Sequence, residues 1–140
     1  MAQVNVKFKV IDMPAEFSTI TGRKIVTIKN NADWKDYWNR YVTANVEDHG
    51  NWKPMPLPAV DFKLNEIVAV HMGTFSDAGQ RFAVTSVVQG YDFCTVSLKS
   101  QQTKMRMHHV SHPALLIQVP KTRDRVGVSV DGRPLQSDED

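Results

Sequence analysis

Most of this chain is divided into short segments in which apolar and polar residues alternate, with glycine or proline standing between the segments. Residues 4–10 alternate valine and phenylalanine with asparagine and lysine, residues 24–29 are β-branched, and residues 93–99 alternate again. A period of two places successive side chains on opposite faces of a β-strand, so each segment predicts a strand with one buried face. In the third segment the side chains expected to be buried are Cys94, Val96 and Leu98.

The second half of the chain predicts further strands. Residues 64–72 form a nearly continuous apolar run, which is typical of a central strand buried on both faces. A glycine-containing connection at 73–80 leads to another strand at 81–88, and we expect these two strands to pair as a hairpin. Residues 114–120 and 126–130 predict two more strands. The links are too short for helical crossovers, so antiparallel pairing is favoured.

One segment has a different period. In residues 31–42 the apolar side chains recur at offsets of 0, 3, 4, 7 and 8, which places them on one stripe of an α-helix. Asn30 or Asn31 can cap the free amides at its start. We expect this helix to lie on a sheet with a buried stripe made of Trp34, Tyr37, Trp38, Tyr41 and Val42.

These elements predict an α+β, mainly antiparallel β fold of about seven or eight strands. The strands would form a sandwich or a partly open barrel, with one amphipathic helix near residues 31–42. The chain has 140 residues, of which 41% are hydrophobic, so a single domain with its own core is expected. We place that domain at residues 1–132 and an acidic, flexible tail at residues 133–140.

No apolar run approaches the ~20 residues needed to span a bilayer, and the first residues lack an apolar signal core. The sequence as written therefore predicts a cytoplasmic protein without a membrane span. It predicts a secreted or cell-surface protein if a signal segment has been removed, and a virion-associated location is a third alternative. A lone cysteine fits a reducing compartment.

Charge is modest and concentrated in one stripe. The formal net charge is +2; residues 133–140 hold one base and three acids, a sum of −2, so residues 1–132 carry +4. This is far from the charge density of a dedicated nucleic-acid binder. The stripe is either a solvated strand face or a contact for phosphates or an acidic partner, and consists of Lys104, Arg106, His108, Lys121, Arg123 and Arg125.

Chemical motifs are few. Cys94 is the only cysteine, so neither an internal disulfide nor a multi-cysteine zinc site can form. His108 and His112 are weak metal-ligand candidates, because on one strand they would lie about 13 Å apart. His71 or His49 would have to complete such a site. Ser129 lacks the glycine pattern of a nucleophile elbow, so we assign no catalytic or cofactor-binding residue.

Two further regions are candidates for partner contact. Residues 45–58 form a proline-rich stretch that we expect to be an unpaired loop, and its Trp52 either plugs the core edge or contacts a partner. The connection at 73–80 presents Phe75. The full set of partner-binding candidates is Trp52, Phe75, Lys104, Arg106, His108 and Arg123.

From residue 34 to about residue 130, the chain resembles the C-terminal domain of the PrcB family of protease-complex accessory subunits. The carrying motifs are WKDYW at 34–38, PAVDF at 58–62, IVAVHMG at 67–73, AGQRFAV at 78–84, and the ending SHP at 111–113 with VPK at 119–121. The matched residues read as scaffold and are Trp34, Trp38, Asp61, Phe62, Gly73, Gly79, Pro113 and Pro120.

The resemblance implies a non-enzymatic module that binds another protein, either a protease or a larger assembly, without a cofactor. Three alternatives stay open: a phage or other structural assembly component that reuses the fold, a nucleic-acid binder that uses the basic stripe over 104–125, and a hydrolase. Homo-oligomerisation is compatible with each of them.

Overall fold

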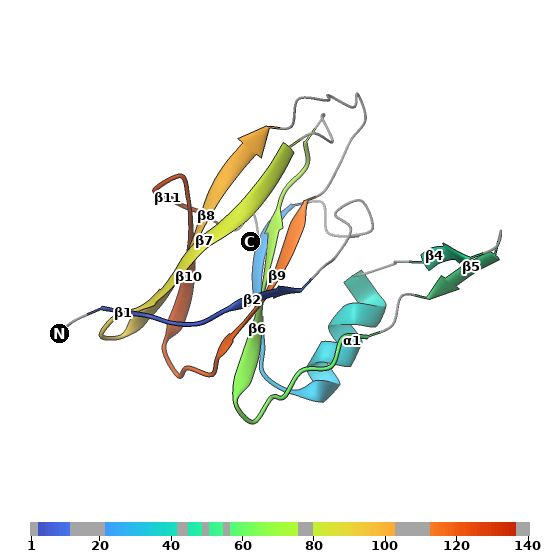
Figure 1. Cartoon of the computed structure of the whole chain (residues 1–140), viewed down its shortest axis with the longest axis horizontal. Helices are drawn as coiled ribbons and strands as arrows, with labels where there is room; N and C mark the ends of the chain where they lie inside the picture. Colours follow the sequence, from blue (N-terminus) through green and yellow to red (C-terminus); the bar gives the residue numbers. More distant parts are fainter. Residues whose placement is uncertain are drawn as a thin grey trace.

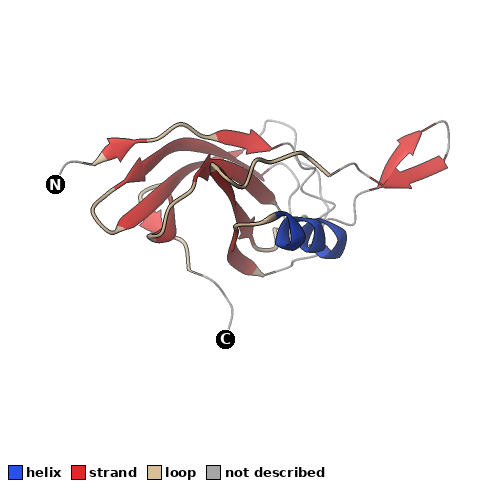
Figure 2. Ribbon diagram, turned by 90° about the horizontal axis from the view of Figure 1, so that it is seen from below, coloured by secondary structure: helices blue, strands red, loops and turns tan. Residues whose placement is uncertain are grey.

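The computed structural model describes residues 3–11, 22–41, 45–48, 51–54, 57–75, 80–102 and 113–136. Two sheets face each other in these residues (Figures 1 and 2). The outer sheet has the strand order β1 (Val4–Asn5), β7 (Gln80–Gln89), β8 (Phe93–Gln102), β10 (Arg125–Val130) and β11 (Arg133–Pro134). The middle sheet has the order β2 (Lys9–Ile11), β9 (Ala114–Pro120), β6 (Asn65–Met72) and β3 (Arg23–Ile28).

Two elements complete the fold. Helix α1 (Asn31–Tyr41) covers part of the free face of the middle sheet, and strands β4 (Asn45–Asp48) and β5 (Asn51–Pro54) form a separate hairpin that stands apart from both sheets in Figures 1 and 2. The predicted mainly antiparallel β fold with one helix is confirmed, and the sheets are not closed into a barrel. Within the described part, no helix is long and apolar enough to cross a membrane.

Strand β6 is the centre of the core, as its apolar run predicts. Ile67 and Ala69 belong to the cluster under α1, whereas Val68 and Val70 belong to the cluster between the two sheets. All four side chains are fully buried. Burying each valine or isoleucine contributes about 1.5–3 kcal/mol, so this strand ties the three layers together.

Helix α1 follows its predicted bounds and cap. The Asn30 side-chain oxygen accepts the Asp33 backbone N–H at 2.8 Å, and the Asn30 amide donates to the Asp33 carboxylate at 2.9 Å. Such a cap is worth about 1 kcal/mol. Trp34 and Trp38 are buried against the middle sheet, and Trp34 Nε1 donates to the Pro58 carbonyl at 2.8 Å. Trp34, Tyr37 and Trp38 of the stripe therefore build core, as expected, whereas the Tyr41 side chain and Val42 lie outside the described residues.

The other matched scaffold residues lie at turns and strand ends. The Asp61 side chain accepts the Lys63 N–H at 3.0 Å, and Phe62 is buried in the cluster under α1. Gly73 has a φ of +96°, a conformation that favours glycine. The Pro113 carbonyl accepts the Met72 N–H, and Pro120 ends β9. The remaining residue of this set, Gly79, lies outside the described residues.

The expected hairpin between residues 64–72 and 81–88 is wrong. Strand β6 pairs with β3 and β9 in the middle sheet, whereas β7 pairs with β1 and β8 in the outer sheet. The connection between β6 and β7 therefore crosses from one sheet to the other. The reason is the apolar character of both faces of β6, which the helix covers on one side and the outer sheet on the other.

The prediction of one half-buried strand at residues 4–10 is also wrong. The segment divides into β1, which pairs with β7, and β2, which pairs with β9. Because it passes from the outer to the middle sheet, its apolar face has no continuous core to contact. Val4 is 57% exposed, and Phe8 and Val10 are also exposed.

One strand pair is parallel within the mainly antiparallel fold. Strand β10 runs parallel to β8, with Arg125 opposite Phe93. Between them the chain passes through β9 in the other sheet, so it re-enters the outer sheet from the same end as β8. A long excursion replaces the helical crossover that parallel strands otherwise need.

Two further segments differ from the prediction. The expected unpaired loop is instead the hairpin β4–β5, in which residues 45–48 pair with residues 51–54. Pro54 occupies the terminal pair of this hairpin, where its missing N–H is tolerated. The chain also stays in the outer sheet beyond residue 132. Asp131 and Gly132 both have positive φ and form a two-residue turn into β11, and the Leu135 N–H donates to the Val128 carbonyl.

Candidate partner-binding surface

Two turns meet at one end of the sandwich, and we call this region the turn end. It consists of the β7–β8 turn at residues 90–92, the β9–β10 turn at residues 121–124 and the strand residues beside them. Gln89 Nε2 donates to the Gly90 carbonyl at 3.1 Å and to the Asp124 carboxylate at 2.7 Å. This amide therefore joins the two turns.

The β9–β10 turn is held by hydrogen bonds from beneath. Glu66 is fully buried, and its Oε1 accepts the Thr122 N–H at 2.7 Å. The Lys121 N–H donates to the Leu64 carbonyl at 3.0 Å, and the Asp124 N–H donates to Thr122 Oγ1 at 3.1 Å. Burying a carboxylate costs free energy. Here the buried Glu66 carboxylate fixes the backbone of a surface turn.

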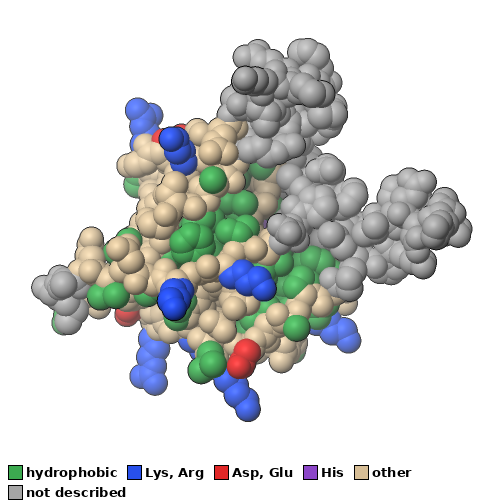
Figure 3. Space-filling model, in the orientation of Figure 1, with side chains coloured by type: hydrophobic (Ala, Val, Ile, Leu, Met, Phe, Trp, Pro, Cys, Tyr) green, Lys and Arg blue, Asp and Glu red, His purple; other side chains and the backbone are tan. Residues whose placement is uncertain are grey.

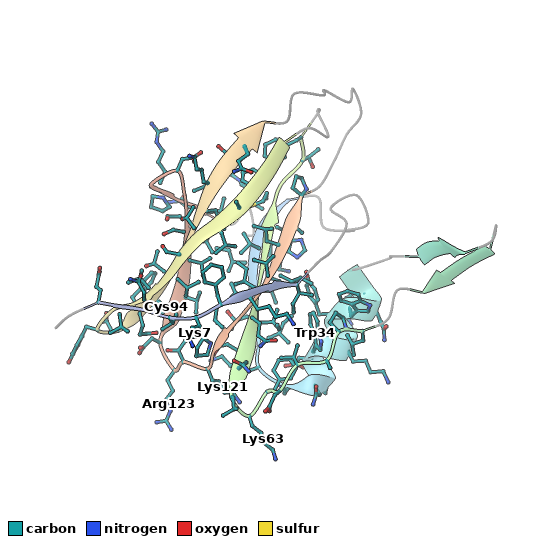
Figure 4. The ribbon with its side chains drawn as sticks, in the orientation of Figure 1. Lys7, Trp34, Lys63, Cys94, Lys121 and Arg123 are labelled. Carbon is teal, nitrogen blue, oxygen red and sulfur yellow. The ribbon has the colours of Figure 1, made fainter. Side chains whose placement is uncertain are left out.

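Cationic side chains gather on this turn. Lys121 Nζ donates to the Phe62 carbonyl at 2.8 Å, and Lys29 Nζ donates to the Thr122 carbonyl at 3.3 Å. Arg123 is exposed and makes no hydrogen bond or ion pair with any described residue. A hollow of about 360 Å³ is lined by Lys29, Lys121, Thr122 and Arg123. Lys and Arg side chains project from this lower edge of the molecule, among them Lys63, Lys121 and Arg123 (Figures 3 and 4).

Aromatic side chains lie on the other turn. Tyr91 is 76% exposed and Phe93 44% exposed. The Phe93 ring covers Gly127, where a Cβ atom would come within 2.4 Å of the ring. A hollow of about 410 Å³ runs beside these rings toward the outer face of β8, and is lined by Gln3, Val88, Gly90, Tyr91, Asp92, Phe93, Thr95 and Ser97.

A third hollow, of about 460 Å³, connects the aromatic and the cationic parts. Tyr91 and Arg123 both line it. It shares Gly90 and Tyr91 with the aromatic hollow, and residues 121–123 with the cationic one. The turn end is therefore one continuous surface with an aromatic and a basic part.

Two buried side chains, Glu66 and Cys94, lie beneath the turn end. Glu66 Oε2 is buried and has no hydrogen-bond partner among the described residues. Cys94 is buried beside it, and burial, together with the negative charges of Glu66 and Asp124, raises the pKa of the thiol. The thiol is therefore protonated at neutral pH and is not activated as a nucleophile.

A second buried polar pair lies under α1, away from the turn end. The Tyr37 hydroxyl and His71 Nε2 are 2.6 Å apart, and His71 is 1% exposed. Burial, with a smaller contribution from the Lys24 charge, lowers the pKa of His71 to about 4. The imidazole is thus neutral and enclosed between helix and sheet, and it packs as a core residue.

The predicted contact residues fall in different places. Arg123 lies at the turn end. Phe75 is half-buried against Phe82, with ring centroids 5.7 Å apart, so it helps to close the core edge. The Trp52 backbone belongs to β5, but its side chain lies outside the described part. The remaining candidates, which also lie outside it, are Lys104, Arg106, His108 and His112.

Two other chemical candidates from the sequence are a nucleophile at Ser129 and a metal site. Ser129 is a strand residue whose hydroxyl lies 3.3 Å from the Ser97 hydroxyl, as expected for an ordinary position on β10. Among the residues that the structure describes, no three His, Cys, Asp or Glu side chains lie close enough together to hold a metal ion.

Sequence reasoning did not find Tyr91 and Lys29 as parts of one surface, nor Glu66 as the buried residue that supports it. The carboxylate of Glu66 at the start of an apolar run was the available signal, because a charge in a central strand needs a partner. No family model, no curated protein and no solved structure matches this chain. The resemblance to the PrcB family therefore stays a prediction from short motifs.

Proposed function

We propose that this protein is a non-enzymatic module that binds another protein through its turn end. One observation carries the proposal: Tyr91 and Arg123 are both exposed and line the same hollow, on two turns joined by the hydrogen bond between Gln89 and Asp124. Tyrosine and arginine are the residue types that most often dominate the energy of protein interfaces.

The turns are well suited to binding because little ordering is required of them. The backbone of the β9–β10 turn is already fixed by Glu66 and by the Leu64 carbonyl, so binding would not have to order it. Fixed loops lose less conformational entropy on association, which favours affinity.

The reactive groups of the described part support a binding role over catalysis. The Cys94 thiol is buried and protonated, and His71 is enclosed under the helix. Each of these groups contributes to packing. A role as an accessory subunit of a protease complex or of a larger assembly is what the resemblance of residues 34–130 implies, and we adopt it as part of the proposal.

The test is affinity capture of partners with the tagged chain from cells of its source organism. Wild type is compared with Tyr91→Ala and with Leu57→Ala, a control that trims another exposed apolar side chain. We expect a partner captured by wild type and by Leu57→Ala, with at least a 10-fold loss for Tyr91→Ala, the equivalent of about 1.4 kcal/mol. Equal capture by all three proteins would refute a binding role for the turn end.

A further inference from the structure

We propose that the cationic hollow formed by Lys29, Lys121 and Arg123 receives carboxylate side chains from an acidic segment of the partner protein. This inference rests on the proposed function and names the chemistry of the partner at the basic part of the turn end. Its support lies in the donors that line the hollow, in the hydrogen bonds that hold the turn, and in the acids that line the two neighbouring hollows.

The donors are set in place before a ligand arrives. Each lysine ammonium uses one N–H on a backbone carbonyl, Lys121 on Phe62 and Lys29 on Thr122, and keeps two for a ligand. Arg123 has no partner among the described residues, so its whole guanidinium fork is available. Arginine binds a carboxylate through two parallel hydrogen bonds, which adds direction to the attraction.

The turn that carries Arg123 cannot easily collapse onto the protein. Glu66 holds the Thr122 amide from below, and Gln89 donates a hydrogen bond to Oδ2 of the Asp124 carboxylate, the residue next to Arg123 in sequence. The arrangement keeps Arg123 pointing away from both sheets, as Figure 4 shows.

The bordering acids favour a short acidic protein segment over a nucleic acid. Asp92 is exposed between Tyr91 and Phe93, and Asp124 lies beside the connecting hollow. A phosphate backbone carries its charges on the chain itself and would bring them past these acids once it left the cationic hollow, whereas glutamate carboxylates lie on flexible side chains that can turn toward the cations. A peptide can place carboxylates at Arg123 and an apolar side chain at Tyr91, which matches the two parts of the surface.

The test uses defined peptides and the full chain. A fluorescein-labelled octaglutamate peptide, an octaglutamine peptide and a single-stranded DNA of about 10 nucleotides are titrated by fluorescence anisotropy at about 30 mM salt, where screening is weak. We expect binding of octaglutamate only, with at least a 10-fold loss in Arg123→Glu and a further loss when salt is raised to about 300 mM.

The matched control is Lys99→Glu, which makes the same change in net charge. Lys99 is exposed and lies six residues along β8 from Phe93, about 20 Å from the turn end. We expect this variant to bind octaglutamate within 2-fold of wild type. Both substitutions are at exposed positions, and an unchanged thermal midpoint checks that each variant is folded.

Three outcomes would overturn the inference: no octaglutamate binding by wild type, equal losses in Arg123→Glu and Lys99→Glu, or tighter binding of the DNA. The proposed function is judged separately, by partner capture. If Tyr91→Ala loses the partner while Arg123→Glu retains both it and octaglutamate, the protein-binding role stands and the acidic-segment inference fails.

Discussion

Protonation of His71 should destabilise the folded protein at mildly acidic pH. His71 is enclosed under α1 and hydrogen-bonded to Tyr37, and its pKa falls from 6.5 to about 4 on folding. Between these two pH values the unfolded chain holds a proton on this imidazole and the folded chain does not. The stability contributed by neutral His71 is therefore full above pH 6.5 and is lost as the pH falls through about 4.

The magnitude follows from the difference between the two pKa values. Each unit of pKa corresponds to about 1.4 kcal/mol. The fall from 6.5 to about 4 therefore predicts a loss of about 3 kcal/mol in the free energy of unfolding, complete below pH 4. Such a loss is a large part of the 5–15 kcal/mol typical of folded domains.

The assay is urea denaturation of wild type and of His71→Gln at several pH values from 7.5 to 3.5. Glutamine can keep a hydrogen bond to the Tyr37 hydroxyl but does not titrate. Carboxylates titrate in both proteins, so the difference between the two pH profiles isolates His71. We expect wild type to lose about 3 kcal/mol more than the variant over this range. Parallel profiles would refute the burial of a neutral imidazole under α1.

Three further predictions concern the turn end. Glu66→Ala should lower the free energy of unfolding by about 2–4 kcal/mol, because the Thr122 N–H loses its acceptor and a void forms, whereas Glu66→Gln should stay within about 1 kcal/mol of wild type in urea denaturation. The Cys94 thiol should react with a disulfide reagent at least about 100-fold more slowly in the native protein than in denaturant, since it is buried and protonated. Gly127→Ala should displace the Phe93 ring, costing less than about 1 kcal/mol of stability because the ring is half-exposed, but weakening partner capture.

Each of these predictions has a contrary result. A Glu66→Ala protein as stable as wild type would show that the buried carboxylate does not hold the turn. Reaction of native Cys94 at the rate of the denatured chain would contradict its burial. Unchanged partner capture by Gly127→Ala, together with a displaced Phe93 ring, would remove that ring from the proposed interface.

The sequence predicted well whatever depends on neighbours along the chain. The spacing of Trp34, Tyr37 and Trp38 identified α1, and the capping by Asn30 followed from residue type alone. The alternation in residues 93–99 correctly assigned Cys94, Val96 and Leu98 to the buried face. These signals are local, because they depend only on the geometry of one helix or one strand.

Sheet membership could not be predicted in the same way. Whether β6 pairs with β7 or with β9 depends on which layers cover its two faces, and that is decided by contacts far apart in the sequence. The parallel pairing of β8 with β10 has the same origin. The Asp131–Gly132 turn is different, since an Asp-Gly pair is a local signal for a two-residue hairpin turn, and the prediction did not use it.

The candidate surface was predicted only in part. Lys121 and Arg123 were predicted as parts of one basic stripe, and both lie at the turn end, but Lys29 and Tyr91 beside them were not predicted. These residues come from separate connections that meet only when both sheets have formed. A surface assembled from distant turns leaves no continuous motif in the sequence.

Site-specific photocrosslinking tests the central claim most directly. The chain is produced in cells of its source organism with Tyr91→p-benzoylphenylalanine and, separately, with Leu57→p-benzoylphenylalanine, and both are irradiated. We expect a discrete covalent adduct with another protein from position 91 and none from position 57. An adduct from position 57 alone, or none from either position, would contradict a partner-binding role for the turn end.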